Sequence, residues 1–188
     1  MSHYQAVAIG CSTGGLAALE AILPALPADF PAALLVVMHS APESRNLLVD
    51  LLARRCKLPV QEAEEKESVD PGKIYVAPPG YHLLIEDDHT FSLSNDAKVS
   101  YARPSLDVLF EAAADVYGSH LVGVVLTGAN HDGAGGLKAI AAAGGLCLVQ
   151  DPATAEARTM PESALKACPQ ARSVPLDELA TVLIEVLK

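Results

Sequence analysis

Four short runs of apolar residues place the strongest constraint on the fold of this chain. They cover residues 4–9, 32–38, 121–126 and 146–149, and apolar side chains in them are nearly continuous rather than alternating. Runs of this kind are typical of strands that are buried on both faces, as in parallel sheets with helices on either side. Because parallel strands need long crossover connections, we expect helices between them along the chain.

Helical patterns do separate these runs. The predicted helices cover residues 16–26, 44–55 with Ser44 as the cap, 105–117, a segment that ends at 143, and 176–187. Shorter strands with Pro-Gly turns are predicted at residues 60–65, 73–77, 82–86 and 90–94, the last two as a hairpin. This order predicts an α/β fold: a three-layer, doubly wound, mainly parallel sheet with an antiparallel hairpin at one edge. We expect one domain over residues 1–188.

Composition excludes several classes of protein. The chain has 188 residues, of which 51% are hydrophobic, so it has enough apolar material for a packed core and is not disordered. Its 13 basic and 23 acidic residues give a net charge of −10, which argues against a nucleic-acid partner. No apolar run approaches the roughly 18 residues of a membrane span. The four cysteines lack metal-ligand or paired spacing, so we expect no metal site and no disulfide framework, and reduced thiols fit a cytoplasmic protein.

Polar residues that directly follow buried strands are the candidates for chemistry. Ligands in such sheets bind outside the carboxyl ends of the strands, where Ser12, His39 and Asp132 are predicted to lie. Since neighbouring strands are about 4.8 Å apart, these side chains can meet. By their roles they form a triad in which Ser12 is the nucleophile, His39 is the general base and Asp132 accepts the Nδ1–H of His39.

Ser12 lies in the motif Gly10-Cys11-Ser12-Thr13-Gly14, which has the form G-x-S-x-G between a strand and a helix. The amides of the helix N-terminus, the Thr13 N–H first, would stabilise an oxyanion. The alternative is a glycine-rich turn that binds a phosphate or only connects two elements. The order Ser, His, Asp differs from the order Ser, acid, His of the α/β-hydrolases.

The other two positions also have alternative interpretations. Asp132 precedes a glycine, where an aspartate is commonly a turn residue or a helix cap. His39 is equally consistent with a polar residue that only ends a strand, and His131 in the same loop as Asp132 competes with it as the base. The remaining histidines, at the terminus, at the hairpin tip or at the amino ends of strands, are weaker candidates: His3, His82, His89 and His120.

Six motifs, in order along almost the whole chain, narrow these alternatives. They are Ile9-Gly-Cys-Ser-Thr-Gly-Gly15, Val37-Met-His39, Tyr75-Val-Ala-Pro-Pro-Gly80-Tyr-His-Leu83, Arg103-Pro-Ser-Leu-Asp-Val-Leu109, Leu126-Thr-Gly128 with Asp132-Gly-Ala134, and Met160-Pro161. Together they resemble the catalytic domain of the CheB-type chemotaxis protein-glutamate methylesterases.

The resemblance implies a doubly wound hydrolase that removes methyl groups from glutamate methyl esters on chemoreceptor cytoplasmic helices and deamidates particular receptor glutamines. By position, Ser12 resembles the nucleophile, His39 the general base and Asp132 its orienting partner. The methylated cytoplasmic domain of a chemoreceptor is then the partner, and no cofactor is needed.

The chain departs from the family pattern in three places. Members usually carry an N-terminal receiver domain, whereas few residues precede the first strand here. Regulation is then expected to come from a separate receiver or regulatory protein, or to be absent. Met38 replaces a common glutamine before the histidine. Ala129 and Asn130 replace the methionine and glycine that line the site in the family. The candidate oxyanion and pocket residues of this chain are therefore Thr13, Gly14, Ala129 and Asn130.

These departures keep two alternatives open. One is a triad esterase or amidase whose main substrate is a small ester or a glutamine amide. The other is a non-catalytic signalling or binding module, although no triad residue has been lost. The net charge of −10 adds a further expectation, that a neutral ester approaches more easily than the product carboxylate, which would be repelled.

Overall fold

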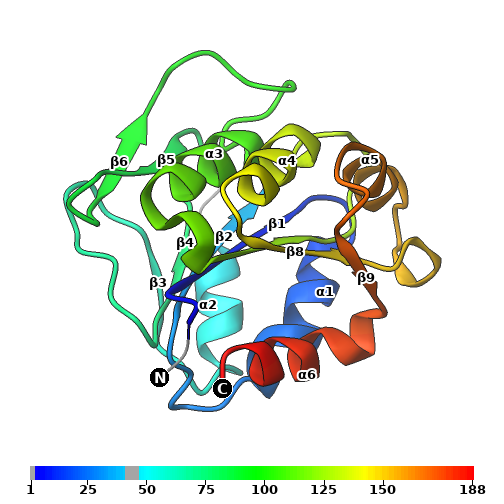
Figure 1. Ribbon diagram of the computed structural model, residues 1–188. Helices are drawn as coiled ribbons and strands as arrows, with labels where there is room; N and C mark the ends of the chain where they lie inside the picture. Colours follow the sequence, from blue (N-terminus) through cyan, green and yellow to red (C-terminus); the bar gives the residue numbers. More distant parts are fainter. Residues whose placement is uncertain (1–2, 41–46) are drawn as a thin grey trace.

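A seven-stranded parallel sheet forms the centre of the computed structural model, which describes residues 3–40 and 47–188 (Figure 1). The strands run in the order β3-β4-β2-β1-β7-β8-β9. Their bounds are β1 Ala6–Cys11, β2 Ala33–Met38, β3 Val60–Glu62, β4 Ile74–Val76, β7 Leu121–Val125, β8 Leu146–Gln150 and β9 Arg172–Val174. The four apolar runs of the sequence are the four central strands, because these are covered on both faces.

Three helices cover each face of the sheet (Figure 1). One layer consists of α1 (Gly15–Ile22), α2 (Leu47–Ala53) and α6 (Leu176–Val186). The other consists of α3 (Leu106–Tyr117), α4 (Ala134–Ala142) and α5 (Thr159–Ala167). Short 3₁₀ turns occupy Leu23–Ala25, Gly118–His120 and Pro152–Thr154. No helix in the two described ranges is long and apolar enough to cross a membrane.

The predicted fold class is confirmed, and the details differ in two respects. The hairpin of β5 (His82–Ile85) and β6 (Phe91–Ser94) pairs only within itself instead of extending the main sheet. The sequence analysis also missed α5 and β9. Pro161 interrupts the helical pattern of α5, and β9 has only three residues, two of them exposed. Ser44, the predicted cap of α2, lies outside the described residues.

The strand order reverses at β1, which positions the candidate site. The chain passes from β1 to β2 on one side and later to β7 on the other. Crossovers therefore leave β1 in opposite directions, and a crevice is expected at the carboxyl ends of β2, β1 and β7. This is the edge of the sheet to which Ser12, His39 and the loop with Asp132 belong.

Small side chains on one face of β1 let α3 approach the sheet closely. Ala6 and Ala8 face the layer of α3, and Gly10 continues that face, whereas the larger Val7 and Ile9 face the opposite layer. A Cβ atom added at Gly10 would lie 2.1 Å from Leu106 Cδ2 at the start of α3. The position of the N-terminus of α3 thus depends on Gly10 having no side chain.

The Gly10→Ala substitution is expected to lower the free energy of unfolding by about 1–3 kcal/mol, because the added methyl group overpacks the contact with Leu106. Urea denaturation measures the change. Gly135→Ala is the matched control: its new Cβ would meet nothing closer than 3.6 Å, and alanine favours the helix by up to about 1 kcal/mol. Equal stability of Gly10→Ala and the native chain would contradict the close approach.

Candidate active site

Ser12 is held in a tight turn between β1 and α1. Its carbonyl accepts a hydrogen bond from the Gly15 N–H at 2.7 Å, which closes the turn. Gly14 has a left-handed backbone with φ 78°, and a Cβ there would lie 2.7 Å from the Cβ of Glu156. Glycine is therefore required at this position on both conformational and steric grounds.

Backbone hydrogen bonds join the ends of the three strands around Ser12. The Ser12 N–H donates to the carbonyl of Thr127, beyond β7, at 2.9 Å. The His39 N–H, beyond β2, donates to the carbonyl of Cys11 at 3.2 Å. Cys11 and Met38 are register partners, so Ser12 and His39 directly follow a pair of neighbouring residues. The parallel register thus places these two residues beside each other, as predicted from the strand ends.

His39 and Asp132 form a hydrogen-bonded pair. The distance from His39 Nε2 to Asp132 Oδ2 is 2.7 Å, with the histidine side chain 13% exposed and the aspartate side chain fully buried. The sequence analysis expected the Nδ1–H of His39 to face this carboxylate, and that detail is wrong. Nε2 faces Asp132 instead, because Nδ1 is engaged by Asn130 at 3.2 Å.

Asp132 also caps the N-terminus of α3. Its Oδ1 accepts from the Ser105 hydroxyl at 2.9 Å and the Asp107 N–H at 3.0 Å, and its Oδ2 accepts from the Leu106 N–H at 2.7 Å. Burial alone would raise the pKa of this carboxyl. The hydrogen bonds from His39, from the two amides and from Ser105 outweigh that cost and lower its pKa below the ordinary value. The carboxylate is therefore ionised beside the imidazole.

Asp107, in the first turn of α3, caps the next helix, α4, in a similar way. Its Oδ1 accepts from the Gly133 N–H at 3.0 Å and the Gly136 N–H at 2.7 Å, which caps the N-terminus of α4. Burial raises the pKa of Asp107, and the nearby charge of Asp132 adds to that shift against the two amide donors. Each helix is thus capped by an aspartate that belongs to or precedes the other. Sequence reasoning missed Asp107, although it lies inside a motif that carried the family resemblance.

Ser12 and His39 line one cavity of about 530 Å³ at this edge of the sheet. Its floor is the turn from Ser12 to Leu16, and Glu20, Met38 and Glu156 complete the wall. No hydrogen bond joins Ser12 Oγ to His39, both of which the structure describes. The two side chains therefore share an open cavity into which a substrate carbonyl can enter.

The four predicted pocket residues differ in how they lie. Thr13 is exposed, and neither its N–H nor that of Gly14 donates to another group within the described ranges, so both amides are available to a ligand. Asn130 is half-buried against His39, whereas Ala129 is exposed in the same loop. The available amides lie next to Ser12, which is where an oxyanion would form.

The other histidines do not enter this network as bases. His131 is exposed, and Asp132 bonds to His39 instead. His82 was expected at the amino end of a parallel strand, but β5 belongs to the hairpin. Its ring is buried, and its Nδ1 accepts from the Ser105 N–H at 3.2 Å. His82 therefore supports the start of α3, a role that the sequence analysis missed although His82 lies inside a motif that carried the family resemblance.

Cys11 precedes Ser12 but is not a second nucleophile. It is fully buried in the layer of α1, and burial raises the pKa of its thiol to about 12. Since the thiolate is the reactive form, the thiol is inert at neutral pH. The residues described in the structure contain no group of three or more His, Cys, Asp or Glu side chains that could hold a metal ion.

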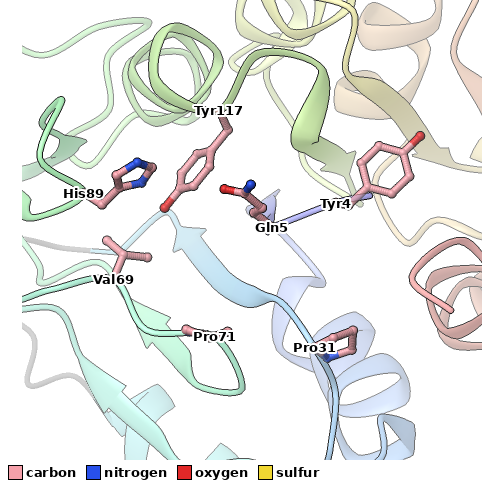
Figure 2. A pocket seen from close by; sticks show the side chains of 7 residues that line it. All are labelled: Tyr4, Gln5, Pro31, Val69, Pro71, His89 and Tyr117. Atoms are coloured by element: carbon pink, nitrogen blue, oxygen red, sulfur yellow. The ribbon is translucent and has the colours of Figure 1, made fainter. Parts of the chain in front are cut away.

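A further cavity of about 440 Å³ lies at the opposite, amino edge of the sheet (Figure 2). Figure 2 shows Tyr117 between His89 and Gln5, with the prolines below them. The residues that line this cavity are Tyr4, Gln5, Pro31, Val69, Pro71, His89 and Tyr117. None of these is a serine, a cysteine or a carboxylate, so the candidate chemistry lies at the carboxyl edge.

The fold and the strand-end residues define a doubly wound α/β protein of the hydrolase kind. The sequence profile of CheB methylesterase matches residues 7–183, and the chain belongs to this family. A solved structure, the CheB methylesterase catalytic domain of Thermotoga maritima, superposes with a TM-score of 0.94 at 34% identity and covers 97% of this chain and 98% of that chain.

Curated relatives agree with this assignment. A protein of Symbiobacterium thermophilum named protein-glutamate methylesterase/protein-glutamine glutaminase is 37% identical over 94% of this chain and 49% of its own length. A protein of Leptospira interrogans, named for the same pair of activities, is 47% identical over 98% of this chain and 95% of its own length. The chain thus matches almost all of one relative and about half of the other.

The Asp132→Asn substitution is expected to destabilise the fold by about 2–4 kcal/mol at pH 7, because it removes a buried charge that caps α3 and pairs with His39. The lowered pKa of Asp132 stabilises the native state above the unfolded value of about 3.9, and this contribution is lost as the pH falls through the folded pKa.

The difference between native and Asp132→Asn proteins should therefore shrink as urea denaturation is repeated from pH 7 down to pH 3. Asp177→Asn, in the first turn of α6 and remote from the site, is the control. A difference that stays constant with pH would contradict the lowered pKa.

Proposed function

We propose that this protein is a serine hydrolase that removes methyl groups from glutamate methyl esters of chemoreceptors, with Ser12, His39 and Asp132 as its triad. The observation that carries the proposal is the 2.7 Å pair between His39 and the buried, ionised Asp132, at the end of the strand next to Ser12. Membership of the CheB methylesterase family supports the substrate class.

The reaction follows from the arrangement of these groups. Ser12 Oγ attacks the ester carbonyl carbon, and its proton passes to Nδ1 of His39, since Nε2 already donates to Asp132. The oxyanion is received by the free N–H groups of Thr13 and Gly14. The C–O bond then breaks, and methoxide takes the proton from His39 and leaves as methanol. Water attacks the acyl-enzyme with His39 again as base, which releases the carboxylate and restores Ser12.

Asp132 orients the base and stabilises its protonated form. Because it is anchored by Ser105, Leu106 and Asp107, the carboxylate does not need to reorganise when the imidazolium forms. An amide substrate would follow the same steps with ammonia in place of methanol. This is the basis for a second activity on receptor glutamines.

The charges of the cavity favour a neutral substrate over the acidic product. Glu20 and Glu156 line it, and its lining contains no lysine or arginine from residues 3–40 and 47–188. Glu20 is paired with Arg55 at 3.4 Å, whereas none of the ion pairs of the described residues includes Glu156. A methyl ester can bind beside Glu156, but the carboxylate that hydrolysis produces would be repelled.

The proposed partner is the methylated cytoplasmic domain of a chemoreceptor, which places the enzyme in the cytoplasm. Asn130 contacts His39 and Ala129 is exposed in the same loop, so both would contribute to the choice of receptor segment.

The Ser12→Ala substitution is expected to lower kcat for methanol release from methylated receptor by roughly 10⁶-fold, and an Asp132 replacement by about 10⁴-fold. A fluorophosphonate should label the native chain at Ser12 and leave Ser12→Ala unlabelled. Ser92→Ala, in the separate hairpin, should behave as the native chain.

Methanol release by Ser12→Ala at the native rate would exclude the mechanism. Methanol, ammonia and small-ester turnover are then compared for the native protein. A preference for small esters by orders of magnitude would defeat the receptor assignment while leaving the triad intact.

The Glu156→Gln substitution is expected to strengthen inhibition by the demethylated receptor peptide roughly two- to fivefold, because it removes one repulsive charge. The inhibition constant is measured at low and high salt, and the difference should fade at high salt. Glu185→Gln, which removes an equal charge from an exposed position on α6, is the control. An unchanged inhibition constant would show that Glu156 does not affect the product.

A further inference from the structure

Asn130 hydrogen-bonds to both His39 and Asp132, the base and the acid of the proposed triad. Its Nδ2 lies 3.2 Å from Nδ1 of His39, and its Oδ1 accepts a hydrogen bond from the Asp132 N–H at 3.1 Å. The side chain therefore contacts the nitrogen of His39 that Asp132 does not occupy. No other side chain within the described ranges hydrogen-bonds to this nitrogen.

The chemistry of the neighbours determines which atoms donate. An ionised carboxylate can only accept, so Nε2 of His39 carries the proton that faces Asp132. In the neutral ring Nδ1 is then the nitrogen with the lone pair. The Asp132 N–H can only donate, which assigns the amide oxygen of Asn130 to it and leaves the amide nitrogen for His39. Asn130 therefore donates to Nδ1.

We propose that Asn130 is a positioning residue that occupies the lone pair of the general base in the unliganded protein and so competes with Ser12. This inference rests on the proposed function, in which Nδ1 of His39 takes the proton of Ser12. It explains why Ser12 and His39 line one cavity without a hydrogen bond between them. Substrate binding must move the Asn130 amide away before the hydroxyl can be activated.

Proton transfer from Ser12 to His39 also works against the contact with Asn130. Once Nδ1 is protonated, both it and the Asn130 amide nitrogen are donors, so their contact becomes unfavourable. The amide cannot simply reverse, because its oxygen is bound to the Asp132 N–H. A cavity of about 140 Å³ on this side of His39, also lined by Tyr101 and Arg103, provides space into which the amide can swing.

Two substitutions separate this role from a structural one. Asn130→Ala removes the donor and should raise the rate of fluorophosphonate labelling of Ser12 by roughly 2- to 10-fold, the factor for one neutral hydrogen bond. Asn130→Asp keeps the acceptor for the Asp132 N–H but offers Nδ1 a carboxylate, which holds a second proton on the ring and should slow labelling. A merely structural role would slow both variants. His131→Ala, exposed in the same loop, is the control and should label at the native rate.

Imidazole ¹⁵N NMR of the native protein and Asn130→Ala supplies a readout that does not depend on catalysis. The Nδ1 resonance of His39 should move toward that of a free lone pair in the variant, while Nε2 stays protonated. An unchanged resonance, or labelling of Asn130→Ala at or below the native rate, would overturn the proposal. If native Ser12 is not labelled at all, the proposed function fails, and the NMR comparison still decides whether Asn130 contacts His39.

Discussion

The site depends on the hydrogen bonds that the buried carboxylate of Asp132 accepts. It accepts hydrogen bonds from His39, from Ser105 and from two amides of α3, so one charged group orients the imidazole and caps a helix. A carboxylate without exposure would be costly to ionise if any of these donors were absent. Helix α3 and the candidate base are thus positioned by the same group, and neither is positioned independently of the other.

The sheet and the helix layer supply what that carboxylate needs. Small residues on one face of β1 admit the start of α3, and Leu106 fills the space that Gly10 leaves. Asp107 then caps α4, the helix that follows the Asp132 loop. The register of β1 with β2 places His39 beside Ser12. Each of these contacts links segments that are far apart in the sequence, so the site exists only in the folded chain.

Much of this arrangement could be predicted from the sequence, because buried strands have a clear apolar signature and polar residues at their ends stand out. Asp132 shows where prediction stops. Its two interpretations, helix cap and partner of His39, both describe the structure, but the helix it caps is α3 and not the one that follows it. The predicted orientation of the His39 ring was wrong because the ring also contacts Asn130, through Nδ1. The roles of His82 and Asp107 were missed although both residues lie in motifs, because their contacts are tertiary and a motif does not show which group a side chain contacts.

The reciprocal capping of α3 and α4 has a consequence for how the protein loses activity. Since the group that orients the candidate base is also the first-turn acceptor of α3, the start of this helix cannot loosen while the candidate base stays aligned. The alignment of His39 is therefore lost as soon as the start of α3 moves away from Asp132. A more flexible but still folded form would already have lost the alignment of its candidate base.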